Sequence, residues 1–234
     1  MVAPLYVETE IHAPMDLLWL LTQDPARHRR WDLRFTEIEP LPSAVGGAGR
    51  FRYATRVLPF LTVAGAGIHA GERRRADGGC TSALRFASDH PLSLIREGSG
   101  YWRYLPGTEA VGFITGYDYR PRWGRAGRLV DAVLFRPLMG WATAWSFDRL
   151  RIWLESGVPP EAARTRAIVE VGIRLLAVSA TTALHPVLGL AVAVTAVLAP
   201  PLPTTPAARR CRRTPSTPVR TPQIAATLTP QETR

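Results

Sequence analysis

Five side chains in the first 160 residues are the candidates for a general acid or base, and their spacing decides what they can do. They are His69, the neighbouring pair Asp89 and His90, Glu97 and Asp118. They form no Ser–His–Asp order, no nucleophile elbow, no pair of carboxylates and no cluster with the spacing of metal ligands. A lone histidine in a strand is most often a structural or surface residue. The sequence therefore leaves the catalytic residues unknown and predicts neither a metal site nor a cofactor.

Aromatic side chains recur at alternate positions of several segments that read as strands. Successive side chains of a strand point to opposite faces, so Phe51 and Tyr53 share one face, as do Phe113 and Tyr117. An apolar surface with a few hydroxyl groups is the usual composition of a small-molecule site. The alternative is that these side chains only pack a core. Tryptophans of a later helix complete the predicted ligand-binding set: Phe51, Tyr53, His69, Phe86, Phe113, Tyr117, Trp141 and Trp145.

Glycines lie in the strands that carry this set. Gly65, Gly67 and Gly71 fall in the same segment as His69, so the face that His69 takes depends on where the strand bends. A sheet that curls around a helix needs such bends. The segment GGAGRF is followed by a strand rather than a helix, so it is not a dinucleotide-binding loop.

The composition excludes several kinds of chemistry. All 29 basic residues among the 234 are arginine, and neither lysine nor asparagine is present, a bias typical of a GC-rich bacterial genome. Schiff-base lysines and the P-loop lysine are therefore excluded. Cys80 and Cys211 lack metal-ligand spacing and are expected to be unpaired thiols. The first residues have no basic start and no long apolar run, so they do not read as a signal peptide.

The net charge of +10 is unevenly distributed along the chain. Residues 1–160 hold 20 arginines against 16 acidic residues, while residues 200–234 alone contribute +5. The remaining excess is spread along the predicted strands, and no nucleic-acid-binding motif is present. We therefore expect no nucleic-acid partner.

The order of the predicted elements is a strand, two short helices, about six antiparallel strands and one long helix over 135–157. Pro14 directly precedes the first predicted helix and favours its start, and Asp24 caps the second. The long helix has apolar surface on more than one side. One side must close the face of the sheet that is turned away from water, because no other large apolar element is available within 1–160. The other side must meet something else.

This order resembles the START-like (SRPBCC) superfamily, which includes polyketide cyclases, dehydrases and lipid-transfer proteins. The resemblance rests on the strand that ends in IHAP, on LLW and on DPARHRRWD, followed by the long carboxy-terminal helix. It covers about residues 3–157. It implies an α+β helix-grip fold, in which a curved antiparallel sheet wraps around the helix and leaves an apolar cavity. The fold alone implies no single reaction, because it hosts binders, carriers and enzymes.

The last third of the chain reads differently. Gly157 and the following proline pair end the long helix. The stretch 175–199, from Leu175 to Ala199, carries no formal charge and is long enough to span a bilayer. It predicts a membrane anchor, either one span or a short helical hairpin divided at LHP; the alternative is a soluble helix pair that packs on the sheet. Eight prolines and eight threonines in residues 200–234 predict disorder.

The sequence thus predicts a START-like domain over 1–160, an apolar helical segment over 161–203 and a disordered tail over 204–234. The expected function is binding of an apolar or aromatic small molecule, such as a lipid or polyketide, by a membrane-associated protein whose domain is cytoplasmic. One alternative is a polyketide cyclase or dehydratase, with His69 or Asp118 as the base. The other is a structural or interaction protein whose pocket is only a core.

Overall fold

The computed structural model describes residues 3–42 and 49–216. These residues form seven strands, six α-helices and two short irregular helices, η1 and η2. In chain order the elements are β1 (Leu5–Ile11), α1 (Met15–Gln23), α2 (Pro25–Trp31), β2 (Glu37–Leu41), β3 (Arg50–Leu58), β4 (Leu61–Arg74), β5 (Cys80–Ala87), β6 (Ile95–Pro106), β7 (Val111–Pro121), α3 (Gly124–Val130), η1 (Asp131–Phe135), α4 (Arg136–Ser156), α5 (Pro160–Leu184), α6 (Pro186–Leu198) and η2 (Ala208–Arg210).

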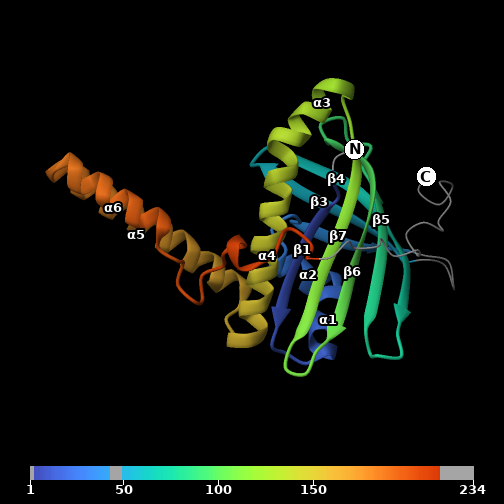
Figure 1. The fold of residues 1–234 in the computed structure, drawn as a ribbon. Coiled ribbons are helices and arrows are strands. Elements are labelled where there is room, and N and C mark those ends of the chain that lie inside the picture. Colours follow the sequence, from blue (N-terminus) through green and yellow to red (C-terminus); the bar gives the residue numbers. More distant parts are fainter. Residues whose placement is uncertain (1–2, 43–48, 217–234) are drawn as a thin grey trace.

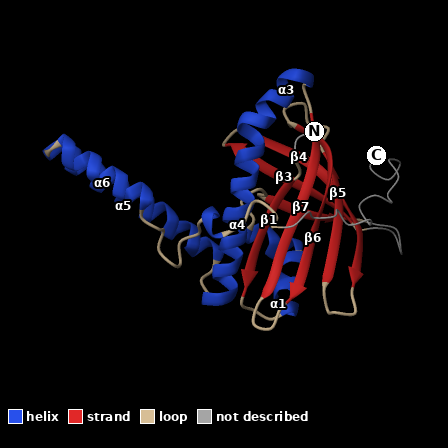
Figure 2. Cartoon of the chain, viewed as in Figure 1, coloured by secondary structure: helices blue, strands red, loops and turns tan. Residues whose placement is uncertain are grey.

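All seven strands belong to one antiparallel sheet with the order β1-β7-β6-β5-β4-β3-β2. The strands from β2 to β7 follow one another as hairpins, and β1 adds to the far edge beside β7 (Figure 2). The two helices α1 and α2 therefore connect the two opposite edges of the sheet. This is the predicted element order, and the strand bounds differ from the expected ones by only a few residues.

Helix α4 crosses the inner face of the sheet (Figure 1). Phe147 stacks on Phe113 of β7 with ring centroids 4.4 Å apart. Four residues earlier, the Thr143 hydroxyl lies 2.8 Å from the Tyr117 hydroxyl. Gly157 ends the helix with φ 66°, a left-handed conformation that glycine adopts without strain. The predicted long helix and its stop are confirmed.

Local sequence explains the two short helices. The Asp24 carboxylate accepts hydrogen bonds from the backbone N–H groups of Ala26 and Arg27, at 2.8 and 3.1 Å, and so caps α2. At the end of α2, Trp31 is fully buried and donates its indole N–H to the carbonyl of Leu21 at 2.9 Å. This bond ties α2 to α1 over the end of the sheet.

Helices α5 and α6 leave the domain as a hairpin (Figure 1). The chain breaks at His185, which is extended, and Pro186 starts the second helix. Helix α5 is long and apolar enough to cross a membrane, and none of its apolar window is buried. The sequence left three possibilities open for this segment: one span, a helical hairpin divided at LHP, or a soluble helix pair that packs on the sheet. In the described structure the segment is a hairpin divided at His185.

Residues 203–212, which we call the strap, return from the hairpin to the domain. The backbone of Arg212 exchanges two 2.9 Å hydrogen bonds with Glu8, so the strap covers the free edge of β1. Ala208 and Cys211 are buried in the main core. The prediction of disorder is therefore wrong for residues 204–216. Proline and threonine content does not reveal that a few small side chains of a segment are buried against the rest of the domain. The rest of the predicted tail, 217–234, lies outside the described residues.

Candidate ligand-binding site

The strand register places six of the eight predicted binding residues on the inner face of the sheet. Tyr117 and Phe113 of β7 face α4, and residues directly paired across antiparallel strands share a face. The pairs Tyr117–Gly100, Gly98–Phe86, Phe86–Gly67 and Gly67–Phe51 carry this face across β6, β5, β4 and β3. Tyr53 pairs with Gly65, and His69 with Leu84. The inner face thus carries Phe51, Tyr53, His69, Phe86, Phe113 and Tyr117.

The two predicted tryptophans of α4 lie elsewhere, and this expectation is wrong. Trp145 is two residues from both Thr143 and Phe147, which face the sheet, and two residues turn an α-helix by about 200°. Trp145 therefore points away from the sheet, and it is stacked with Trp141, with centroids 6.4 Å apart. Trp141 is 43% exposed. The apolar residues of α4 that include Trp141 and Trp145 thus lie on the outer side of the helix. The side that faces the sheet carries the polar residue Thr143 as well as Phe147.

The inner face has two halves with different packing. Over β6 and β7, aromatic side chains fill the space beneath α4. All of them are buried: Trp31, Trp102, Tyr104, Phe113 and Phe147. Over β3, β4 and the second half of β5, the large inner side chains are only half-buried: Phe51, Tyr53, His69, Leu84 and Phe86. We call this second group the aromatic inner surface. It holds four of the eight predicted binding residues.

Glycines allow these rings to lie against the sheet. A Cβ atom on Gly98 would lie 2.5 Å from the Phe86 ring, so Phe86 covers the place of the missing side chain. Tyr53 and Phe51 cover Gly65 and Gly67 in the same way. Aromatic rings over cross-strand glycines stabilise strongly curved sheets. The strand glycines therefore shape the inner surface, as the sequence indicated.

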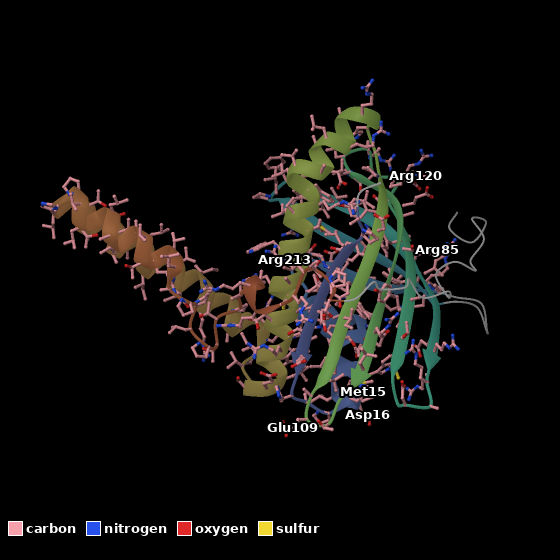
Figure 3. All side chains as sticks on the ribbon, in the orientation of Figure 1. Met15, Asp16, Arg85, Glu109, Arg120 and Arg213 are labelled. Atoms are coloured by element: carbon pink, nitrogen blue, oxygen red, sulfur yellow. The ribbon has the colours of Figure 1, made fainter. Side chains whose placement is uncertain are left out.

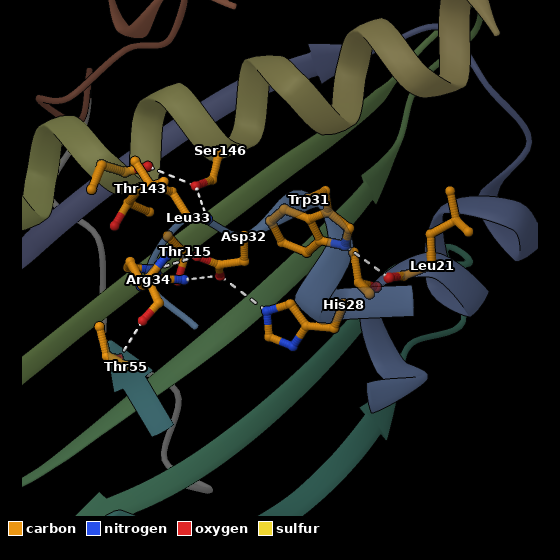
Figure 4. A network of polar contacts seen from close by, with 12 residues as sticks. Leu21, His28, Trp31, Asp32, Leu33, Arg34, Thr55, Thr115, Thr143 and Ser146 are labelled. Carbon is orange, nitrogen blue, oxygen red and sulfur yellow. Dashed lines mark hydrogen bonds and ion pairs between the residues drawn. The ribbon is translucent and has the colours of Figure 1, made fainter. Parts of the chain in front are cut away.

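A buried polar cluster adjoins the aromatic inner surface, and sequence reasoning missed it (Figure 4). The Asp32 carboxylate accepts hydrogen bonds from the Arg34 guanidinium at 2.6 and 2.9 Å and from His28 Nε2 at 3.0 Å. The Arg34 guanidinium also lies over the Tyr117 ring, 5.4 Å from its centroid. Phe35 then contacts Tyr53 edge-on, with centroids 5.7 Å apart. The cluster lies in the segment DPARHRRWDLRF, whose sequence predicted a capped helix but not the burial of its charged side chains.

Neighbouring elements hold this cluster in place. The Ser146 hydroxyl of α4 accepts the backbone N–H of Leu33 at 2.8 Å, and the Thr55 hydroxyl of β3 donates to the Arg34 carbonyl at 2.5 Å. Figure 4 shows both bonds on either side of Asp32. These two bonds fix the backbone of the loop that follows α2 between the long helix and the sheet.

The electrostatics of the cluster follow from its burial. Burial lowers the pKa of His28, and the nearby Asp32 carboxylate does not offset this effect, so His28 is neutral at neutral pH. Burial alone would raise the pKa of Asp32, but Arg34 and His28 outweigh burial and lower it. Asp32 and Arg34 are thus both ionised and neutralise one another.

The aromatic inner surface is also uncharged. Burial lowers the pKa of His69 and raises the pKa of Tyr53 to about 12, so both side chains are neutral at neutral pH. The His69 and Phe51 rings are in contact, with centroids 5.2 Å apart. The strand register shifts between His69 and Gly71, where the glycine has φ 132°. This bulge is the bend that the sequence left unplaced, and it leaves His69 on the inner side.

The other candidate acids and bases do not join His69. Asp118 pairs with Ser99 and lies on the outer face of β7, where it is 53% exposed and forms an ion pair with Arg136 at 3.2 Å. Exposed Glu97 forms an ion pair with Arg120 at 3.0 Å. Asp89 and His90 lie in the turn after β5. This placement leaves His69, and not Asp118, as the candidate base for the cyclase alternative.

A separate polar hollow lies outside the grip, between β1, the end of α4 and the strap. Its volume is about 710 Å³, and it is open to solvent. Four of its charged side chains pair with one another: Arg151 contacts Glu155 at 2.6 Å, and Arg212 contacts Glu8 at 3.5 Å. The hollow therefore follows from the seating of the strap and does not have the apolar composition of a site for an apolar ligand.

Comparison with known proteins found a curated relative of clear similarity. No protein-family model matches the chain. The chain is 46% identical over 169 residues to "Uncharacterized membrane protein YndG" of Bacillus subtilis (strain 168). The aligned part is 72% of this chain and 63% of the relative, so the chain spans less than two thirds of that protein's length.

Solved structures resemble the chain at low sequence identity. A protein from Thermus thermophilus aligns with a TM-score of 0.50 and 19% identity, over 66% of this chain and 98% of that one. A STAR-related lipid transfer protein from Xanthomonas axonopodis aligns with a TM-score of 0.49 and 17% identity, over 64% and 84% of the two chains. At such identities, similarity shows the fold and nothing further. The strand order, the long helix held against the inner face and the structural similarity identify the helix-grip fold that the sequence predicted.

Proposed function

We propose that the protein binds an apolar or aromatic small molecule, such as a lipid or a polyketide-like compound, against the aromatic inner surface. The observation that carries this proposal is the difference between the two halves of the inner face. Aromatic side chains fill one half completely, while Phe51, Tyr53, Leu84 and Phe86 remain half-buried on the other. Aromatic groups that line one concave surface and stay accessible are typical of a binding site rather than of a core.

The charges around this surface select the class of ligand. Asp32 neutralises Arg34, and both His28 and His69 are neutral, so these groups offer a bound molecule no net charge. The Tyr53 hydroxyl remains protonated and donates to the Ala87 carbonyl at 3.4 Å, so its oxygen can accept one hydrogen bond from a ligand hydroxyl. We therefore propose a largely apolar, uncharged ligand with at most a few polar oxygens, positioned by Tyr53.

The apolar hairpin supports a membrane location for this binding domain. We propose that α5 and α6 tether the domain to the bilayer and that the domain lies on the cytoplasmic side. The tether would keep the binding site close to a source of apolar molecules. The similarity to a membrane protein of Bacillus subtilis supports the same location.

Ligand binding can be tested with a matched pair of phenylalanine variants. An apolar fluorescent probe is titrated into the full-length protein in detergent, and mass spectrometry identifies what copurifies with the protein. Phe86→Ala removes an inner ring and should weaken probe binding about tenfold, or ~1.4 kcal/mol. Phe60→Ala removes a ring that is 86% exposed in the turn after β3 and should change nothing. Equal affinities for wild type and both variants would refute the proposed site.

A polyketide cyclase or dehydratase is the second candidate, and one observation favours it. His69 is neutral, lies on the inner surface and contacts Phe51, so it has the state and position of a weak general base. In this case His69→Ala should abolish turnover of a nascent polyketide while the protein still binds the product. Unchanged turnover by His69→Ala would remove the enzyme reading.

A further inference from the structure

Both ends of the apolar hairpin are fastened to the same folded domain. At its start, Arg149 of α4 donates to the carbonyl of Pro160 at 2.8 Å, and Arg30 forms an ion pair with Glu161 at 2.8 Å. At its end, the strap is held by Asp148 of α4, which accepts from the Ala207 N–H at 2.8 Å. The chain therefore leaves and re-enters the domain on one side.

The two helices of the hairpin lie side by side with a defined base and tip. At the base, the Arg174 guanidinium donates to the carbonyls of Ala199 and Pro200, each at 3.0 Å, and pairs with Glu170 at 2.5 Å. Near the tip, a Cβ atom on Gly189 would lie 2.6 Å from the Cα of Thr182. Small residues allow helices to approach this closely in membranes.

The surface of the hairpin between base and tip fits lipid on every side. Figure 3 shows side chains that radiate from both helices away from the rest of the chain. The hydroxyls of Thr181, Thr182 and Thr195 each donate to the carbonyl four residues earlier, so none of them needs water. The exposed apolar side chains between base and tip include Leu175, Leu176, Leu184, Val187, Leu188, Leu190, Val194, Val197 and Leu198.

We propose that this hairpin enters the membrane monotopically: it dips into one leaflet, turns at His185 and returns to the side from which it came. Helix α6 has 13 residues, about 20 Å at 1.5 Å per residue, while the hydrocarbon core of a bilayer is about 30 Å thick. The hairpin is thus too short for two crossings. A single crossing would place the strap across the membrane from α4 and β1, which it contacts.

The charged groups at the base agree with this topology. Arg174 and Arg209 both donate to carbonyls at the end of α6, at the level where the apolar surface stops. Arg164 and Arg166 precede them, and Arg210 and Arg212 follow. With both ends on one side, all of these arginines lie on that side, and the positive-inside rule then favours the cytoplasm. The inference rests on the proposed tether, which it refines by fixing the topology.

Three cysteine variants of the full-length protein test the topology in spheroplasts of a bacterial host. Glu109→Cys reports on the domain, Thr214→Cys on the chain after the hairpin and His185→Cys on the tip; all three positions are exposed in the structure. Cys80 and Cys211 are buried, and the wild type measures their background labelling. Each variant is treated with a membrane-impermeant maleimide before and after the spheroplasts are opened, and again in detergent.

A monotopic hairpin predicts that Glu109→Cys and Thr214→Cys react together, only after opening, while His185→Cys reacts only in detergent. Reaction of Thr214→Cys before opening and of Glu109→Cys only afterwards would show a single crossing and overturn the proposal. Reaction of His185→Cys without detergent would show a hairpin that does not insert, and would overturn it too. Recovery of the protein in the supernatant after ultracentrifugation would refute the tether itself, which is a separate result.

Discussion

Replacement of Asp148 by alanine should release the strap and destabilise the domain. The Asp148 side chain is fully buried and binds three donors: the Arg151 guanidinium at 2.7 Å, the Arg210 guanidinium at 2.9 Å and the Ala207 N–H at 2.8 Å. Without the carboxylate, half-buried Arg210 loses its countercharge, Arg151 keeps only Glu155, and a buried backbone donor loses its acceptor.

The expected magnitude follows from these contacts. Removal of one member of a buried ion-paired group costs about 3–5 kcal/mol. For a chain of this size, each kcal/mol lowers the melting temperature by roughly 2–4 °C, so we expect a decrease of roughly 6–20 °C. Thermal unfolding in detergent measures this change. Limited proteolysis with an arginine-specific protease should cleave after Arg209 or Arg210 in the variant before it cleaves the wild type.

The matched control is Arg212→Ala. Arg212 lies in the same strap, but its side chain is 57% exposed and its ion pair with Glu8 is 3.5 Å long, so its loss should cost about 1 kcal/mol or less. Equal melting temperatures and equal cleavage rates for the two variants would contradict the docking of the strap on α4.

Three further changes have defined outcomes. Trp145→Ala should cost about 3–5 kcal/mol of stability in urea unfolding, because the ring is 9% exposed, and should leave probe affinity unchanged, because the ring faces away from the sheet. Burial lowers the pKa of His28 below its unfolded value of about 6.5, so the unfolded state takes up a proton first as the pH falls. The contribution of neutral His28 to the free energy of unfolding is therefore complete above that pH and decreases below it. His28→Leu should flatten this decrease between pH 7 and 5. Gly189→Ala should loosen the hairpin and increase its protease cleavage in detergent, whereas Gly172→Ala, whose Cβ meets nothing within 4 Å, should not.

The sequence was sufficient for the elements and for most of the inner face. The alternation of apolar and polar residues shows which side chains of one strand share a face. The apolar faces predicted in this way for β3, β5 and β7 placed Phe51, Phe86 and Phe113 together on the inner face. Helix bounds followed from residues whose backbone preferences are strong, such as Asp24 and Gly157. These signals are local, and no distant contact changes them.

The missed features depend on contacts between distant parts of the chain. Nothing in the sequence marked Asp32 and Arg34 as a buried pair, because only the packing of α4 and β3 around them makes them buried. The strap reads as disordered, since its order comes from Asp148 and from the free edge of β1. Trp145 was assigned to the sheet side because aromatic residues usually face a core, but helix geometry turns it to the other side of α4, where it is buried beside Trp141 and Arg149.

Photoaffinity labelling of the full-length protein in native membranes tests the central claim most directly. The probe is an apolar polycyclic molecule that carries a diazirine, and peptide mass spectrometry locates its adducts with and without excess unlabelled competitor. Saturable adducts on Phe51, Tyr53, Leu84 or Phe86 are predicted, because these half-buried residues form the aromatic inner surface. Adducts confined to residues 175–198, and unaffected by competitor, would show that the probe only partitions around the hairpin and would contradict ligand binding by the domain.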